Sequence, residues 1–236
     1  CSRIILRNLL GQAFQENDLS HLSGHIAIGH TRYSTTGSSN INNAQPILSK
    51  GTSTEISLAH NGNVINAMDL REELLDWGIQ FQSSGDSEII AHLIANAPAE
   101  NWPDRIAYIM RRLQGAYSLV VMTNQEVLGV RDPLGVRPLC IGKLNSGWVL
   151  ASESCALDHI GAEFVREVEP GEAVLINDNG ITSIYKKPKE GVFGRCVFEH
   201  IYFSRPDSLL DGQLVYSARM AMGAQLAKEF PVEADL

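Results

Sequence analysis

The sequence has 236 residues, of which 44% are hydrophobic, and it carries a formal net charge of −8 at pH 7. A chain of this size can bury a large core within one domain, or within one domain and part of another. The acidic balance argues against nucleic acid as a partner, because such binding requires a clustered basic face. No apolar run reaches membrane-spanning length, so we expect no membrane partner, and Arg3 and Arg7 interrupt what would be the apolar region of a signal peptide.

The four cysteines, at positions 1, 140, 155 and 196, have no paired spacing. This pattern argues against a zinc site and against a disulfide framework. We therefore expect a cytoplasmic, reducing compartment.

The first half of the chain combines two predicted strands with three predicted helices. Residues rich in β-formers predict strands over 25–33 and 56–60. Apolar residues at helical spacing then predict three helices, over 67–77, 86–95 and 104–113. Asn66 has the position and side chain of an N-cap for the first of these helices.

From residue 116 onward the pattern changes to short strands separated by turn residues. The predicted strands are 116–122, 127–130, 148–152, 172–176 and 181–185. A loop over 186–194 and a helix over 216–230 follow. Short spacing favours antiparallel pairing, and helices grouped before strands predict a layered α+β fold.

Three short blocks place polar side chains at the ends of these elements. Arg32 lies where the first strand passes into a loop rich in hydroxyl groups. Asn61 and Gly62 follow the second strand, and Asp86 begins the second helix. Each block also has a plain structural interpretation: a surface ion pair for the arginine, a hairpin turn for the Asn-Gly pair and a helix-dipole contact for the aspartate.

Together these blocks resemble the glutamine site of the class II glutamine amidotransferases. Asn43-Ala-Gln-Pro46 and the segment Glu199–Ser208 extend the likeness to the amidophosphoribosyltransferase family within that class, over a range from Ile4 to Ala227. The resemblance implies an α+β fold, the four-layer αββα N-terminal nucleophile hydrolase sandwich. In that fold two antiparallel sheets lie between helical layers.

The resemblance implies acyl transfer from glutamine, in which a nucleophile attacks the side-chain amide and ammonia leaves. The oxyanion that develops must meet donors already in place. Asn61 offers its side-chain NH₂ group for this catalytic role. Gly62 offers a backbone N–H with no Cβ to block a close approach.

The resemblance also assigns substrate-binding residues. Arg32 would hold the α-carboxylate of glutamine, and Asp86 would hold its α-ammonium group. Tyr33 and Thr35 lie in the loop that folds over bound glutamine in the family.

Two further blocks match the family and are interpreted as structural turns. They are the segments Asp132–Pro138 and Ser152–Ser154. Arg131 and Arg137 are expected to form ion pairs rather than to catalyse. His60 is expected to be a buried polar residue with a satisfied side chain.

The family nucleophile is an N-terminal cysteine whose own α-amine serves as the general base. We predict that Cys1 is not this nucleophile, because Ser2 and Arg3 follow it in place of glycine and an apolar strand. The family's His-Arg-Gly-Gln block is also absent, and Arg32 follows at about half the family separation. We therefore expect a truncation at both ends and a chain that is inactive by itself.

The resemblance divides the chain into two parts. Residues 1–190 would form the glutaminase domain without its N-terminal strand, and 191–236 a linker with the start of the phosphoribosyltransferase domain. The resemblance implies that the parent enzyme would hydrolyse L-glutamine and pass ammonia to phosphoribosyl pyrophosphate. The product is 5-phosphoribosylamine, in the first step of purine nucleotide synthesis, and the full-length enzyme is expected to be a homo-oligomer.

No cofactor is expected in this chain, and Mg²⁺ would belong to the missing phosphoribosyltransferase domain. Some family members place the first cysteine of an iron–sulfur cluster where Cys196 stands. We predict that Cys196 is metal-free here, because a cluster needs several thiolates and none is grouped near it in sequence.

Two alternatives stay open at this point. One is another class II amidotransferase such as glucosamine-6-phosphate synthase, against which the segment 201–207 argues. The other is a non-catalytic glutamine-binding domain.

Overall fold

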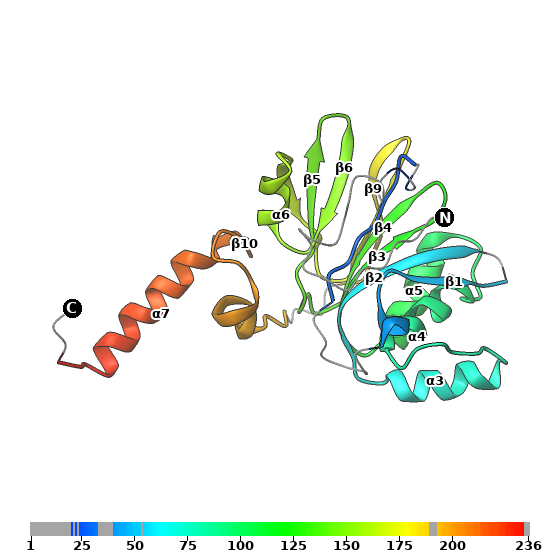
Figure 1. The fold of residues 1–236 in the computed structure, drawn as a ribbon, viewed down its shortest axis with the longest axis horizontal. Helices are drawn as coiled ribbons and strands as arrows, with labels where there is room; N and C mark the ends of the chain where they lie inside the picture. Colours follow the sequence, from blue (N-terminus) through cyan, green and yellow to red (C-terminus); the bar gives the residue numbers. More distant parts are fainter. Residues whose placement is uncertain are drawn as a thin grey trace.

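The computed structural model describes residues 20, 22, 24–32, 40–52, 54–188 and 193–233. Within these residues the chain forms four layers, helix–sheet–sheet–helix, with a C-terminal extension that projects from one side (Figure 1). The predicted α+β sandwich of antiparallel sheets is therefore confirmed.

The larger sheet has six antiparallel strands in the order β1-β2-β3-β4-β8-β9. Their bounds are β1 (Ile47–Lys50), β2 (Glu55–Val64), β3 (Gly115–Met122), β4 (Val127–Arg131), β8 (Glu172–Asn177) and β9 (Gly180–Lys186). The central strands β2 and β3 are joined over eight residue pairs, which makes them the longest ladder of the sheet.

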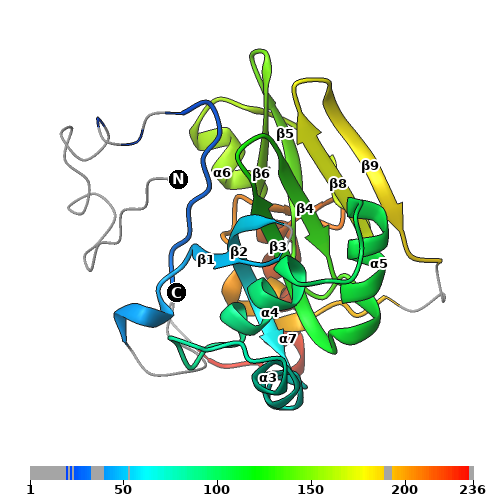
Figure 2. The same cartoon turned by 90° about the vertical axis from the view of Figure 1, so that its right-hand side faces the viewer.

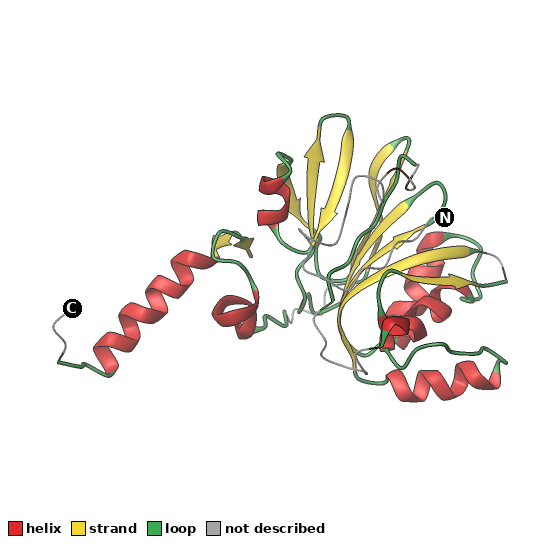
Figure 3. Cartoon of the chain, in the orientation of Figure 1, coloured by secondary structure: helices red, strands yellow, loops and turns green. Residues whose placement is uncertain are grey.

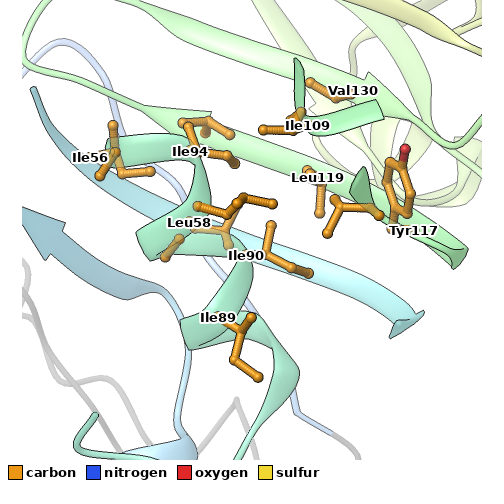
Figure 4. Packing of buried hydrophobic residues seen from close by; sticks show 14 of the residues in the cluster. Ile56, Leu58, Ile89, Ile90, Ile94, Ile109, Tyr117, Leu119 and Val130 are labelled. Atoms are coloured by element: carbon orange, nitrogen blue, oxygen red, sulfur yellow. The ribbon is translucent and has the colours of Figure 1, made fainter. Parts of the chain in front are cut away.

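Three helices lie on one side of this sheet, two of them against its strands and the third beside them (Figure 2). They are α3 (Ala67–Asp76), α4 (Asp86–Ala95) and α5 (Trp102–Arg112). Ile90 of α4 is fully buried, as are Leu58 of β2 and Leu119 of β3, and their side chains meet in the core between helices and sheet (Figure 4). Burying a side chain of this size stabilises the fold by about 1.5–3 kcal/mol.

The smaller sheet packs on the other face and has the strand order β6-β5-β7. Its strands are β5 (Cys140–Leu144), β6 (Gly147–Ala151) and β7 (Glu163–Glu167), and α6 (Ser154–His159) covers its outer face. Ile141 of β5 and Val174 of β8 belong to one buried cluster, which joins the two sheets.

Two helix predictions are correct in position but differ from the structure at the N-terminus, one in its cap and the other in its first residue. The side chain of Asn66 does not cap α3. It donates instead to the carbonyl oxygen of Arg112 and accepts from the amide of Gln114, at 2.8 and 3.0 Å. Helix α5 begins at Trp102, two residues before the prediction, because Asn101 caps it by accepting from the amide of Asp104.

The strand predicted over 25–33 is wrong for its described part. Residues 24–32 form an irregular segment without strand structure, which Figure 3 draws as loop. β-forming residues stabilise a strand only where a neighbouring strand satisfies their backbone groups. No ladder among the described strands includes this segment.

Strand β5 was not predicted, because Gly142 interrupts its apolar pattern. The packing of α6 on this strand explains why a glycine is needed at position 142. A Cβ atom at position 142 would lie 2.6 Å from a methyl group of Leu157, so the helix packs directly on the strand backbone. A glycine inside a strand often marks such a close approach.

The connection from β4 to β5 is organised by a buried turn. Asp132 is fully buried, and its carboxylate accepts from the amides of Leu134, Val136 and Arg137 at 2.9, 3.0 and 3.3 Å. Its Oδ2 also lies 3.4 Å from the amide of Tyr117 on β3. The interpretation of this block as a structural turn agrees with these contacts.

The C-terminal segment docks on the smaller sheet and then leaves it. It comprises a π-helical turn η2 (Glu199–Phe203), the hairpin β10 (Leu209–Leu210) with β11 (Gln213–Leu214), and α7 (Val215–Glu229). The carboxylate of Glu153 accepts from the amide of Arg205 and the hydroxyl of Ser208, at 2.8 and 2.7 Å. Figure 1 shows α7 extending away from the layered body.

A second buried carboxylate fixes the loop that leads into α4. Glu88 accepts from the amides of Gln82 and Ser83, at 2.8 and 2.7 Å, and from the Ser83 hydroxyl at 2.6 Å. Burial opposes the charged form, but the side chain of His92 and these donors outweigh it and lower the pKa of Glu88 to about 2.

The substitution Asp132→Asn should lower the free energy of unfolding by about 2–4 kcal/mol, because its amide nitrogen would face backbone donors that lose their acceptor. Urea unfolding at neutral pH measures the change. Asp178→Asn is the matched control, since Asp178 is exposed in the turn between β8 and β9 and should be near neutral. Equal effects of the two substitutions would contradict a structural role for the buried carboxylate.

Glu88 should make stability depend on acidity. Its folded-state pKa of about 2 lies below the ordinary value of 4.5, so its contribution is present above 4.5 and is lost as pH falls toward 2. The substitution Glu88→Gln should lower stability at pH 7 and flatten the decline between pH 4.5 and 2, as measured by urea unfolding at several pH values. Glu72→Gln, at an exposed position, should leave the profile unchanged.

Candidate functional site

Asn61 and Gly62 lie inside strand β2, opposite Ser118 and Tyr117 of β3. The strand predicted over 56–60 was therefore too short. The alternative interpretation of the Asn-Gly pair as a hairpin turn is wrong, because the ladder with β3 continues through both residues.

The backbone of Gly62 packs too closely on β3 for any side chain. Its φ angle is 151°, and a Cβ atom there would lie 2.0 Å from the carbonyl oxygen of Ala116. Glycine is thus required at this position by strand packing alone.

The side chain of Asn61 is held at both ends. Its Oδ1 accepts two hydrogen bonds from the guanidinium of Arg137, from Nε at 3.0 Å and from Nη2 at 2.7 Å. Its Nδ2 lies 3.4 Å from the hydroxyl oxygen of Ser152, to which it donates. The amide group that the sequence points to as an oxyanion donor therefore has one defined orientation.

Asp86 is the first residue of α4 and contacts the end of β2. Its Oδ2 accepts from the amide of Val64 at 3.0 Å, and its Oδ1 lies 3.7 Å from Nδ1 of His60. A carboxylate in the first helical turn also interacts favourably with the helix dipole. The structure therefore places Asp86 beside the same strand end that carries Asn61.

His60 is buried next to these residues. Its Nδ1 lies 3.2 Å from the Ser87 hydroxyl, but its buried Nε2 meets no hydrogen-bond partner among the described residues, so the prediction of a satisfied side chain holds for only one ring nitrogen. Burial lowers the pKa of His60 to about 4, although the negative charge of Asp86 acts in the other direction and raises it. The imidazole is therefore neutral at pH 7 and leaves the Asp86 carboxylate without a cationic partner at this contact.

Arg32 is half-buried and lies in the irregular segment 24–32. His30 anchors this segment to β2, because its Nε2 lies 3.1 Å from the carbonyl oxygen of His60. Burial lowers the pKa of His30, and the nearby charge of Arg32 adds to this effect. The contacts thus place the arginine segment beside β2, and its role toward a carboxylate stays a prediction.

Three residues that the sequence singled out cannot be placed. Tyr33 and Thr35, predicted to line the glutamine loop, lie outside the described residues, and so does Cys1.

The segment before β1 clamps the two site elements, which the sequence did not indicate. Asn43 accepts from the amide of Ser84 at 3.0 Å, two residues before Asp86. Gln45 accepts from the amide of His60 at 2.6 Å, one residue before Asn61. Two of the three glutamine-site blocks, those of Asn61 and of Asp86, are therefore positioned by one short stretch of chain.

Arg131 and Arg137 form the ion pairs that were expected of them. Arg131 contacts Glu167 at 3.1 Å and donates to three backbone carbonyl groups. Arg137 contacts Glu199 at 2.5 Å, and its second contact, with Asn61, was missed by the sequence. The two blocks that contain Arg137 and Glu199 were recognised, but nothing local indicates that they meet.

Cys196 is half-buried and carries a free thiol. In the part of the chain that the structure describes, His, Cys, Asp and Glu side chains form no group of three suited to a metal ion. That Cys196 is metal-free stays a prediction. None of the described helices is both long and apolar enough to span a membrane.

Comparisons with known proteins agree with this geometry. A family model described as a glutamine amidotransferase domain matches residues 30–159. The chain is 47% identical to the amidophosphoribosyltransferase of Synechococcus elongatus, over 97% of this chain and 47% of that protein. It is 43% identical to the amidophosphoribosyltransferase of Archaeoglobus fulgidus, over 96% of this chain and 50% of that protein.

A solved structure shares the fold. Glutamine phosphoribosylpyrophosphate amidotransferase from Bacillus subtilis, in complex with ADP and GMP, matches with a TM-score of 0.86 and 43% identity, over 96% of this chain and 49% of that one. The chain thus spans about half the length of the relatives it matches. Because the family model covers more than half of the sequence and includes Asn61, Gly62 and Asp86, the chain belongs to the glutamine amidotransferase domain family.

Proposed function

We propose that this chain is the glutaminase portion of an amidophosphoribosyltransferase. It would take part in hydrolysing glutamine and supplying ammonia to phosphoribosyl pyrophosphate, giving 5-phosphoribosylamine for purine nucleotide synthesis. The observation that carries the proposal is the grouping of Asn61, Gly62 and Asp86 at one end of β2, with the Arg32 segment anchored beside it. The names of the relatives support this reading and do not favour glucosamine-6-phosphate synthase.

Each residue has a defined part in the proposed chemistry. The Asn61 NH₂ group and the Gly62 N–H would stabilise negative charge on the amide oxygen as the tetrahedral intermediate forms. Arg32 and Asp86 would hold the two charged ends of the amino acid, and so select free glutamine among amides. Tyr33 and Thr35 would cover the bound substrate.

Residues 1–190 would form the glutaminase domain, and 191–236 would connect it to a phosphoribosyltransferase domain that binds phosphoribosyl pyrophosphate with Mg²⁺. The exposed apolar side chains of the connecting part, among them Met220 and Leu226, are compatible with a neighbouring domain. The full-length enzyme would be a cytoplasmic homo-oligomer.

The two charged contacts with glutamine can be separated with truncated ligands. Arg32→Gln should weaken L-glutamine binding about 30-fold or more, because a buried charge contact is lost. It should leave the affinity for 4-aminobutanamide unchanged, since that ligand lacks the α-carboxylate. Asp86→Asn should show the reverse selectivity, weakening L-glutamine but not glutaramic acid, which lacks the α-ammonium group. Isothermal titration calorimetry measures all four pairs.

Arg71→Gln is the matched control. Arg71 belongs to α3, donates to the carbonyl oxygen of Ser83 and has no part in the proposed site. Its affinity for L-glutamine should equal that of the unmodified chain. If Arg32→Gln weakened all three ligands equally, the arginine would not be the carboxylate contact. Absence of L-glutamine binding by the unmodified chain would count against the proposed function itself.

A further inference from the structure

Arg137 connects the candidate oxyanion donor to the C-terminal segment. One edge of its guanidinium donates twice to Oδ1 of Asn61, and Nη1 contacts a carboxylate oxygen of Glu199. The arginine lies 76 positions from Asn61 in sequence. The contacts join three parts of the fold: strand β2, the turn after β4 and the π-helical turn η2.

The chemistry of the guanidinium decides which end of the Asn61 amide it meets. Arginine has five N–H donors and no acceptor, so only the carbonyl oxygen of the amide can face it favourably. The NH₂ group must then point the other way. One of its hydrogens is directed to Ser152 at 3.4 Å, and among the described residues the second meets no acceptor, so it can be donated to a ligand carbonyl.

The backbone of Arg137 is fixed before its side chain acts. Its amide donates to the Asp132 carboxylate at 3.3 Å. Its carbonyl oxygen accepts from the hydroxyl of Ser118 at 3.0 Å and from Nε of Arg131 at 2.8 Å. The side chain therefore starts from a rigid point, so little conformational entropy is lost when it orients Asn61.

Glu199 supplies the opposite charge in a buried place. Its side chain is only 4% exposed, against 21% for Arg137, and its Oε2 accepts from the Ser204 hydroxyl at 3.1 Å. The guanidinium also lies over the ring of Phe203, 5.3 Å from the centroid. The orientation of Arg137 thus depends on a turn that belongs to the C-terminal segment.

We propose that Arg137 is a positioning residue: it fixes the orientation of the Asn61 side chain, which would donate to the amide carbonyl of glutamine. Glu199 holds the Arg137 guanidinium in the position that this role requires. This inference rests on the proposed function, because it takes Asn61 as the donor to the substrate carbonyl. Arg137 itself touches no reacting atom in this arrangement. A displacement of η2 would release the guanidinium and with it the fixed amide orientation.

The test is a double-mutant cycle on ligand binding. Arg137→Lys keeps the charge beside Glu199 but loses the planar fork that grips Asn61. It should weaken L-glutamine binding roughly tenfold. It should not change the affinity for L-norvaline, which has both α-groups but no side-chain carbonyl. Asn61→Ala should act in the same way, and the double variant should be no weaker than Asn61→Ala alone.

A merely structural role predicts a different pattern. Arg137→Lys would then weaken L-glutamine and L-norvaline equally, or its effect would add fully to that of Asn61→Ala, and either result overturns the proposal. Arg205→Lys is the control, since Arg205 forms an exposed pair with Asp207 in the same segment and should bind both ligands normally.

A second readout does not need a ligand. In the unmodified chain the Asn61 side-chain NH₂ resonances should show a nuclear Overhauser contact to Ser152, and Arg137→Lys and Glu199→Gln should both weaken it. If L-glutamine does not bind but this contact responds as expected, the proposed function fails while the positioning of Asn61 stands. If the contact is unchanged in both variants, the positioning role is wrong.

Discussion

The buried charges of Arg131 and Asp132 fix the path of the chain between the two sheets. Both side chains are almost inaccessible, yet each is surrounded by backbone groups of opposite polarity. A buried charge without such partners would cost several kcal/mol, so the surrounding chain can adopt few other paths. This fixes the turn at which the chain leaves the larger sheet and enters the smaller one, and it fixes where Arg137 begins.

The candidate site follows from that constraint and from the long ladder between β2 and β3. Asn61 pairs with Ser118 of β3, so its backbone cannot move without disturbing that ladder. The partners of the site come from separate parts of the chain: Gln45 before β1, Asp86 on α4 and Arg137 after β4. A site assembled in this way is rigid, which suits donors that must be in place before charge develops.

The sequence predicted the parts of the fold that depend on local pattern. The helix over 86–95 was correct because Ile90, Leu93 and Ile94 repeat at helical spacing, and all three are fully buried. The strand over 25–33 was wrong and β5 was missed, because both depend on neighbours that the pattern does not reveal. A strand requires a ladder partner, and Gly142 makes sense only once Leu157 is seen to pack on it.

The site shows the same division. The resemblance proposed four site residues from the residue order of their blocks, which needs no geometry: Arg32, Asn61, Gly62 and Asp86. The contact between Arg137 and Asn61 could not be found, since it pairs two blocks far apart in the chain. Each block has a sufficient local explanation by itself, the Arg137 block as a turn and the Asn61 block as the end of a strand.

The docking of the C-terminal segment sets up a gradient of local stability along α7. Arg219, in the first half of this helix, donates to the carbonyl oxygens of His200 and Ser204, both at 2.7 Å. From Met220 onward every described residue of the helix is exposed. Amide protons of the first turns therefore exchange with solvent only when the docked segment opens, whereas those of the last turns exchange as they would in an isolated helix. The boundary between the two regimes falls within a single continuous helix.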